Sequence, residues 1–189
     1  MKGAIEKAKE LVQETLGAFS PSQFSNPANP ETYVHTLGPE LWRDLDGEID
    51  VFVAGAGSGG TFMGTAKYLK SQNANIKTVI VEPEGSILNG GEAGSHYTEG
   101  IGMEFLPAYM DKSYFNAIHT VTDRDAFDKL RELSSKEGLL VGSSSGAALF
   151  ASLEEAKVAK PGSHIVTIFA DSSERYLSQN VYDLLKEDE

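Results

Sequence analysis

The chain has 189 residues, of which 40% are hydrophobic and 23% charged, an ordinary composition for a globular protein that can bury a core. With 16 Lys and Arg against 28 Asp and Glu, its formal net charge of −12 repels phosphodiester backbones and anionic lipids, so we expect neither nucleic acid nor membrane as a partner. The absence of cysteine excludes disulfides, thiolate catalysis and cysteine-ligated zinc, and no apolar run approaches the ~18 residues of a membrane span. These features predict a cytoplasmic protein.

The first part of the chain predicts a helix followed by a loop. Apolar residues recur there at helical spacing, at Ile5, Ala8, Leu11, Val12 and Leu16. Gly17 ends this helix, which is amphipathic and unlike a signal peptide. The prolines and asparagines of residues 20–30 predict a loop or a crossing between domains, and a second helix is predicted over residues 31–44.

From residue 49 onward, short apolar runs alternate with helical patterns. Strands are predicted at residues 49–54, 77–81, 117–121 and 164–169. Helices are predicted at residues 60–71, 122–137, from about 145, and 174–185, and Thr122 with Asp125 gives the second of these a capping-box-like start. The alternation predicts an α/β fold, with a mainly parallel open sheet and helices on both faces.

A glycine-rich run joins the first predicted strand to its helix: Gly57, Ser58, Gly59, Gly60 and Thr61. Glycines allow backbone N–H groups to approach a ligand closely, and a helix N-terminus adds about half a positive charge. Both features suit a phosphate group. A glycine-rich turn that binds nothing is the alternative.

The same window also fits a dinucleotide-binding fingerprint. Gly55, Gly57 and Gly60 satisfy the G-x-G-x-x-G pattern, and Glu82 closes the next strand where a ribose-binding acid is expected. Taken alone, this window would predict a nicotinamide or flavin enzyme. The rest of the chain favours another family.

Seven segments, in order, resemble the fold-type II pyridoxal-phosphate enzymes of the cysteine synthase/cystathionine β-synthase family, and bacterial cystathionine β-synthase-like members most of all. They are QFSNPANP at 23–30, TLGPE at 36–40, GSGGT at 57–61, EPEGSIL at 82–88, EGIGMEFLP at 99–107, GSSSG at 142–146 and DSSERYLS at 171–178. The resemblance implies that the chain is a C-terminal portion of such an enzyme. It also implies the large domain of that fold over residues 34–189, with a remnant of the small domain and the crossover in residues 1–33.

The resemblance also implies a cofactor, pyridoxal 5′-phosphate, and roles for particular residues. Residues 57–61 would hold the cofactor's phosphate, and Ser144 would meet its pyridine nitrogen. Gln23 would hold the α-carboxylate of an amino-acid substrate, while Gly100 and Gly102 would line the second-substrate side. Each has a plainer alternative: a helix N-cap for Ser144, a loop polar residue for Gln23 and simple turns for the glycines.

Other polar residues carry weaker signals. Asp171 follows the last predicted strand and is expected to cap the last helix, although it also lies at the edge where open sheets bind ligands. The four histidines lack the spacing of metal ligands, so no metal is expected. They are His35, His96, His119 and His164.

The resemblance leaves one essential group without a counterpart, the lysine that forms a Schiff base with the cofactor. Lys67 and Lys70, on the helix after the glycine-rich run, are expected to face solvent. We therefore expect no catalytic residue in this chain, and activity only with the family's N-terminal half or a second chain. The alternative is a non-catalytic α/β remnant that binds a phosphorylated small molecule or a partner protein.

The sequence leaves the reaction partners open. Serine and O-acetylserine are both compatible as first substrates, and sulfide and homocysteine as thiols. A homo-oligomer is expected as well, because the apolar face of the first helix needs cover.

Overall fold

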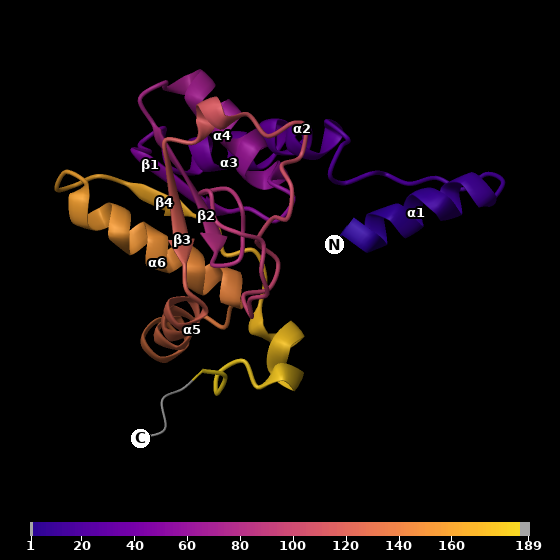
Figure 1. Cartoon of the computed structure of the whole chain (residues 1–189). Coiled ribbons are helices and arrows are strands. Elements are labelled where there is room, and N and C mark those ends of the chain that lie inside the picture. The colour runs from indigo at the N-terminus through magenta and orange to yellow at the C-terminus, as the bar shows by residue number, and fades with distance from the viewer. Residues whose placement is uncertain (1, 186–189) are drawn as a thin grey trace.

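The sheet is built from four parallel strands. In the computed structural model, which describes residues 2–185, these are β1 (Val51–Gly55), β2 (Lys77–Pro83), β3 (Ala117–Val121) and β4 (Ile165–Thr167). Their order is β3-β2-β1-β4, and Val53 at the centre of β1 pairs with Val79 on one side and Thr167 on the other (Figure 1). The predicted α/β class with a mainly parallel sheet is confirmed.

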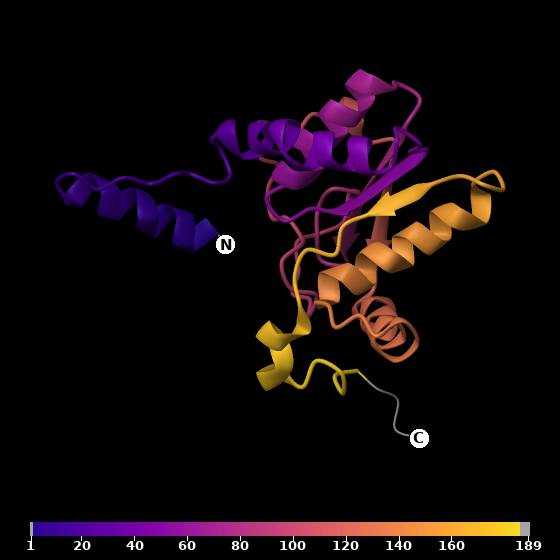
Figure 2. The ribbon, with the colours of Figure 1, turned by 180° about the vertical axis from the view of Figure 1, so that it is seen from behind.

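Helices cover both faces of this sheet (Figures 1 and 2). Helices α2 (Ala28–His35), α3 (Leu37–Asp44) and α4 (Gly60–Gln72) lie on one face, and α5 (Asp123–Glu132) and α6 (Ser143–Val158) on the other. Side chains of a strand alternate between faces. Accordingly Phe52 packs with Phe62 of α4, whereas Val53 packs with Phe127 of α5.

The helix predicted over residues 31–44 ends at Asp44 as predicted but is wrong in its start and its continuity. The structure has two helices there, α2 and α3, and the first begins at Ala28, earlier than predicted. The break falls at Thr36, whose φ of −122° and ψ of −87° are not helical. Pro39 explains the break, since it has no N–H for the carbonyl of His35 and its ring would collide with that carbonyl in a continuous helix.

The helix predicted over residues 174–185 is also wrong. Residues Ser173–Gln179 form a short 3₁₀ helix, η3, which ends at Asn180 in the left-handed conformation with φ of 52°. The turn at Asn180 buries Val181 in the core beneath α5 and α6. Helix α5 likewise ends earlier than predicted and continues as a π-helical turn, η2 (Leu133–Glu137).

A buried ion cluster joins α6 to the start of β2. Glu155, which is 4% exposed, accepts hydrogen bonds from Lys77 at 2.5 Å and from His119 at 2.8 Å. Burial opposes ionisation of Glu155, but the hydrogen bonds from Lys77 and His119 outweigh it, so the pKa of Glu155 is lowered. The cluster therefore ties a helix to two strands through one carboxylate.

Helix α1 (Lys2–Glu14) lies apart from the layers around the sheet (Figures 1 and 2). Its apolar residues are mostly exposed: Leu11 is 48% exposed and Leu16, just beyond the helix, is fully exposed. None of the helices in residues 2–185 combines the length and apolar character needed to cross a membrane.

Candidate functional site

A cavity of about 260 Å³ lies at the carboxyl ends of the strands, over the loop that joins β1 to α4. This edge is where open α/β sheets bind ligands. Most of the predicted site residues line the cavity: Gln23, Gly57, Ser58, Gly59, Thr61, Gly100 and Ser144. Gly60 and Gly102 are not among the lining residues.

The backbone of the glycine-rich loop is left with free donors. The N–H groups of Gly57, Ser58, Gly59 and Thr61 bond to no other residue in the described part of the chain, whereas that of Gly60 meets the Ser58 hydroxyl at 3.4 Å. Helix α4 begins directly after these groups and adds its positive end. The loop can therefore bind an anion with backbone N–H groups.

Two glycines of the loop are required by the fold itself. Gly59 has φ of +84°, and a β-carbon there would lie 2.2 Å from the sulfur of Met110. A β-carbon at Gly57 would lie 2.3 Å from the carbonyl oxygen of Gly100. The glycines thus allow close packing of the chain around the loop, in addition to any approach of a ligand.

A hydrogen-bond network joins the loop to the segment that precedes α2. The Nδ2 atom of Asn29 lies 2.9 Å from the carbonyl oxygen of Gln23, 3.1 Å from the hydroxyl of Ser58 and 3.0 Å from that of Tyr109. The Tyr109 hydroxyl lies 2.8 Å from the Gln23 carbonyl and 3.1 Å from the Ser58 carbonyl. Sequence reasoning missed both Asn29 and Tyr109, because they are far apart in the chain.

The loop that contains Gly100 and Gly102 is pinned by hydrogen bonds. The N–H of Glu99 donates to the hydroxyl of Ser143 at 3.0 Å, and that of Gly102 to the carbonyl of Ala56 at 2.9 Å. Gly102 thereby supports the backbone beside the cavity without lining it. Gly100 lines the cavity directly.

Ser144 lies in the first turn of α6 and has a free hydroxyl. The N-cap of α6 is Gly142, so the alternative role of Ser144 as an N-cap is wrong. Ser144 lines the cavity, and its hydroxyl bonds to no other residue among 2–185. It can therefore donate to, or accept from, a bound molecule.

Asp171 and Tyr176 form a pair in the same cavity. The expected capping role of Asp171 is wrong, since the N-cap of η3 is Ser172 and Asp171 instead accepts a hydrogen bond from the Tyr176 hydroxyl. That bond, together with burial and the negative charge of Asp171, raises the pKa of Tyr176 to about 12. The other carboxylate oxygen of Asp171 is buried with no hydrogen-bond partner among the described residues.

Glu82 is not available to bind a ribose. It is fully buried and accepts hydrogen bonds from the backbone N–H groups of Leu88 and Asn89 and from the Thr120 hydroxyl. Both of its oxygens therefore hold the turn after β2. This geometry argues against the dinucleotide-binding alternative.

No lysine of the described residues lines the cavity. Lys70 is directed to the other end of α4, where its ammonium donates to the carbonyl of Ile76 at 2.7 Å. Lys67 and Lys70 are both only partly exposed, so the expectation that they face solvent is wrong in this respect.

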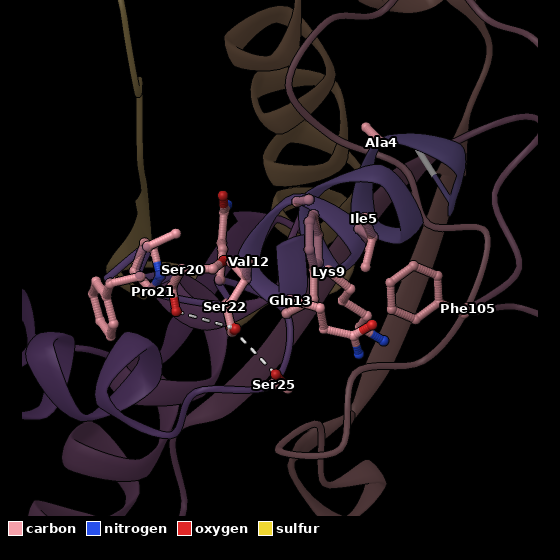
Figure 3. Close-up of a pocket in the computed structure, with 15 residues that line it drawn as sticks. Ala4, Ile5, Lys9, Val12, Gln13, Ser20, Pro21, Ser22, Ser25 and Phe105 are labelled. Carbon is pink, nitrogen blue, oxygen red and sulfur yellow. Dashed lines mark hydrogen bonds between the residues drawn. The ribbon is translucent and has the colours of Figure 1, made fainter. Parts of the chain in front are cut away.

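A larger cavity, of about 730 Å³, lies between α1 and the segment that leads to α2. Figure 3 shows Ile5 beside Phe105 on one side of this groove and Ser20 with Pro21 on the other. Phe105 also packs edge-on against Phe24, with ring centroids 5.6 Å apart. The groove is largely apolar, and Gln23 lines both this groove and the cavity at the glycine-rich loop.

The family model described as pyridoxal-phosphate dependent enzyme matches residues 1–171. This chain belongs to that family. Members of the family, including the cysteine synthases, depend on pyridoxal phosphate. The resemblance drawn from the seven segments is thereby confirmed.

Relatives of this pyridoxal-phosphate family member cover nearly all of its length. An O-acetylserine dependent cystathionine β-synthase of Bacillus subtilis is 62% identical over 97% of the chain, and a cysteine synthase of Helicobacter pylori is 50% identical over 96%. The crystal structure of the O-acetylserine dependent cystathionine β-synthase from Helicobacter pylori superposes with a TM-score of 0.93 at 50% identity, over 96% of this chain. A hydrogen sulfide-producing enzyme of Fusobacterium nucleatum superposes with a TM-score of 0.89 at 42% identity, over 93% of this chain and 60% of that one.

The match is partial on the side of the relatives. The chain spans about 60% of the length of the two curated relatives and 59% of the Helicobacter structure. It is consistent with a C-terminal portion of such an enzyme.

Proposed function

We propose that this chain is the portion of a β-replacing enzyme that holds the phosphate of pyridoxal 5′-phosphate. The observation that carries the proposal is the set of free backbone N–H groups at Gly57, Ser58, Gly59 and Thr61, which line one cavity together with Ser144. The proposed reaction joins serine or O-acetylserine to sulfide or homocysteine, giving cysteine or cystathionine. Relatives named cysteine synthase and cystathionine β-synthase support this choice of chemistry.

The residues of the cavity fit the cofactor at two places. Residues 57–61 offer an anion its donors, and the free hydroxyl of Ser144 offers a partner for the pyridine nitrogen. When bound, pyridoxal phosphate withdraws electrons from the α-carbon of an amino acid, which eases loss of a group from the β-carbon. A neutral hydroxyl leaves the ring nitrogen less protonated than a carboxylate would, which suits elimination and replacement at the β-carbon.

Substrate contacts are assigned to residues that pack beside the glycine-rich loop. The exposed side-chain amide of Gln23 would bind the substrate's α-carboxylate, and its backbone carbonyl is already held by Asn29 and Tyr109. Gly100 would border the second substrate, and Gly102 would hold that loop in place through its bond to Ala56. None of these groups supplies the amine that must attach the cofactor.

We further propose that the lysine comes from outside this chain, so that the chain alone does not turn over substrate. Residues 1–33 would then be a remnant of the small domain together with the segment that crosses to the large domain. Residues 34–189 would be the large domain. The exposed apolar face of α1 and the groove beside it would be covered by the rest of the fold or by a second copy of the chain.

The test compares the chain alone with the chain mixed with the remaining portion of the Bacillus subtilis relative. Cysteine or cystathionine formation is measured from each first substrate with each thiol. We expect no product from the chain alone and product from the mixture. Product made by the chain alone would contradict the assignment of the lysine to another segment.

A second measurement tests the phosphate-holding loop without any turnover. Thr61→Val removes a hydroxyl at the cavity, while Thr65→Val makes the same change one helical turn further along α4, where the hydroxyl is buried with no partner among the described residues. Binding of inorganic phosphate, measured by phosphorus NMR, should weaken in Thr61→Val and not in Thr65→Val. Equal binding by both variants would count against the loop as the anion site.

A non-catalytic role is the second candidate, and the lack of a lysine in the described cavity wall favours it. In that case the chain would bind a phosphorylated small molecule or a partner protein. The two candidates differ in the mixing experiment: a non-catalytic remnant binds phosphate but stays inactive when the remaining portion of the relative is supplied and co-folds with it.

A further inference from the structure

We propose that Asn29 and Tyr109 are positioning residues that hold the Ser58 hydroxyl as a donor into the cavity and couple it to Gln23. The proposal rests on the proposed function, since it concerns how the same cavity recognises a phosphate ester. Asn29 and Tyr109, which do not themselves line the cavity, would then decide which protonation state of the phosphate binds.

The direction of the Ser58 proton follows from its partners. Asn29 donates to the Ser58 oxygen from 3.1 Å, and the N–H of Gly60 points to the same oxygen from 3.4 Å. Both lone pairs of the hydroxyl are therefore met by donors, and among the described residues the Tyr109 oxygen is the acceptor within reach of its proton. Ser58 lines the cavity, and an anion bound there is a stronger acceptor for this proton than the neutral Tyr109 hydroxyl.

Such a fixed donor selects among forms of a phosphate ester. The dianion offers only acceptors, whereas the monoanion carries one proton that would face the donors of the loop. The second pKa of a phosphate monoester is about 6, so the two forms exchange in the ordinary pH range. Binding should therefore strengthen as the dianion forms.

The same two side chains also contact Gln23, the residue proposed to bind the substrate. Tyr109 lies within hydrogen-bond distance of the carbonyl oxygens of Gln23 and Ser58, at 2.8 and 3.1 Å, and Asn29 donates to the Gln23 carbonyl from 2.9 Å. Burial raises the pKa of Tyr109, against the effect of its hydrogen bonds to Ser58 and Asn29, so its hydroxyl remains a neutral donor.

Asn29 also fills the space that Gly60 leaves open, because a β-carbon at Gly60 would lie 2.0 Å from the Asn29 Oδ1 atom. Because Asn29 and Tyr109 each contact both the Gln23 carbonyl and Ser58, a shift of that carbonyl is transmitted to Ser58 through these two side chains. Occupation of the phosphate loop should in turn steady the segment that carries Gln23.

The first experiment measures binding of methyl phosphate, a phosphate monoester without a ring, by phosphorus NMR between pH 5 and 8. In the wild type, affinity should rise as pH passes the second pKa of about 6. Asn29→Asp replaces the donor with an acceptor for the Ser58 proton and adds a negative charge, so affinity should fall by at least about tenfold and its rise with pH should flatten. Tyr109→Phe keeps the ring and loses the hydroxyl, and should weaken binding by about three- to tenfold.

Matched controls make the same chemical changes outside the network. Asn26→Asp alters an amide of the same segment, which bonds to Pro21 and Ala28 and not to the loop. Tyr114→Phe removes a phenol hydroxyl from a partly buried tyrosine of the α4 core. Both controls should bind methyl phosphate within about twofold of the wild type, since neither touches Ser58.

The second experiment tests the coupling by hydrogen exchange. Methyl phosphate should slow amide exchange in residues 23–26 of the wild type. This slowing should be smaller in Tyr109→Phe, which keeps only the Asn29 route between Gln23 and Ser58. Circular dichroism melting confirms that each variant is folded, and Tyr109→Phe keeps the test decisive if Asn29→Asp does not fold.

The outcomes separate the inference from the proposed function. If the wild type binds methyl phosphate and both network variants match it in affinity, pH dependence and exchange, the inference is overturned and the phosphate site stands. If the wild type binds neither methyl phosphate nor inorganic phosphate, the phosphate site is overturned and the inference falls with it.

Discussion

Replacing Gly59 by alanine should destabilise the protein more than the same change at a glycine of similar conformation elsewhere. The left-handed backbone at Gly59, with φ of +84°, costs an alanine about 1–2 kcal/mol. The added β-carbon would also lie 2.2 Å from the Met110 sulfur. Because this sulfur lies near the end of a flexible side chain that can shift, we take the low end of the cost of overpacking, about 1 kcal/mol. Together these effects predict a loss of about 2–3 kcal/mol in the free energy of unfolding.

Gly90 provides the control, because its φ is +82° and a β-carbon there would meet nothing within 4 Å. Gly90→Ala should therefore lose only the backbone cost of about 1–2 kcal/mol. Urea denaturation followed by circular dichroism measures both variants. Equal losses at the two positions would refute the close packing of Met110 around the loop.

Four further results are expected. Glu155→Ala should cost about 1.5–3 kcal/mol, because it removes the hydrogen bonds that a buried carboxylate accepts from two partly exposed basic partners. Glu154→Ala, at a partly exposed position, should change stability by less than about 1 kcal/mol in urea denaturation. Burial opposes ionisation of Glu155, but its hydrogen bonds lower its pKa in the folded protein. Its contribution to the free energy of unfolding is therefore present above the pKa of the unfolded chain, about 4.3, and is lost as the pH falls below that value. The wild type should accordingly lose its greater stability over Glu155→Gln in acid. The hydrogen bond to Asp171 raises the pKa of Tyr176 to about 12, so Tyr176 should contribute stability below pH ~10 that is lost as pH rises towards 12. In a spectrophotometric titration, Tyr176→Phe should lack the phenol that ionises near pH 12 in the wild type. The chain should associate in light scattering and Leu11→Glu on α1 should reduce this, whereas a monodisperse wild-type monomer at high concentration would remove the expectation.

Local patterns were enough to predict most of the sheet and the place of its loop. The strand at residues 117–121 was predicted with its observed bounds, and the loop at residues 57–61 lies between β1 and α4 as expected. Both signals are local, since short apolar runs and glycines constrain the backbone within a few residues. The break at Thr36 was missed, although it follows from a local signal, the effect of Pro39 on the carbonyl of His35.

Contacts between distant residues could not be predicted from such patterns. Asn29 and Tyr109 are 80 positions apart and meet only in the folded chain, where each also contacts Ser58. Asp171 and its partner Tyr176 are only five positions apart, but an aspartate just before a predicted helix also suggests an N-cap. The structure distinguishes the two roles, because the N-cap of η3 is Ser172. Side-chain roles at this site therefore depend on the packing of elements more than on their sequence.

The central claim is that this chain holds the phosphate of the cofactor without supplying the lysine that attaches it. Its most direct test is to treat the 189-residue chain with pyridoxal phosphate and borohydride, and to map modified lysines by mass spectrometry. We predict only scattered, substoichiometric modification, because no lysine of the described residues lines the cavity. Stoichiometric modification of a single lysine would contradict the claim.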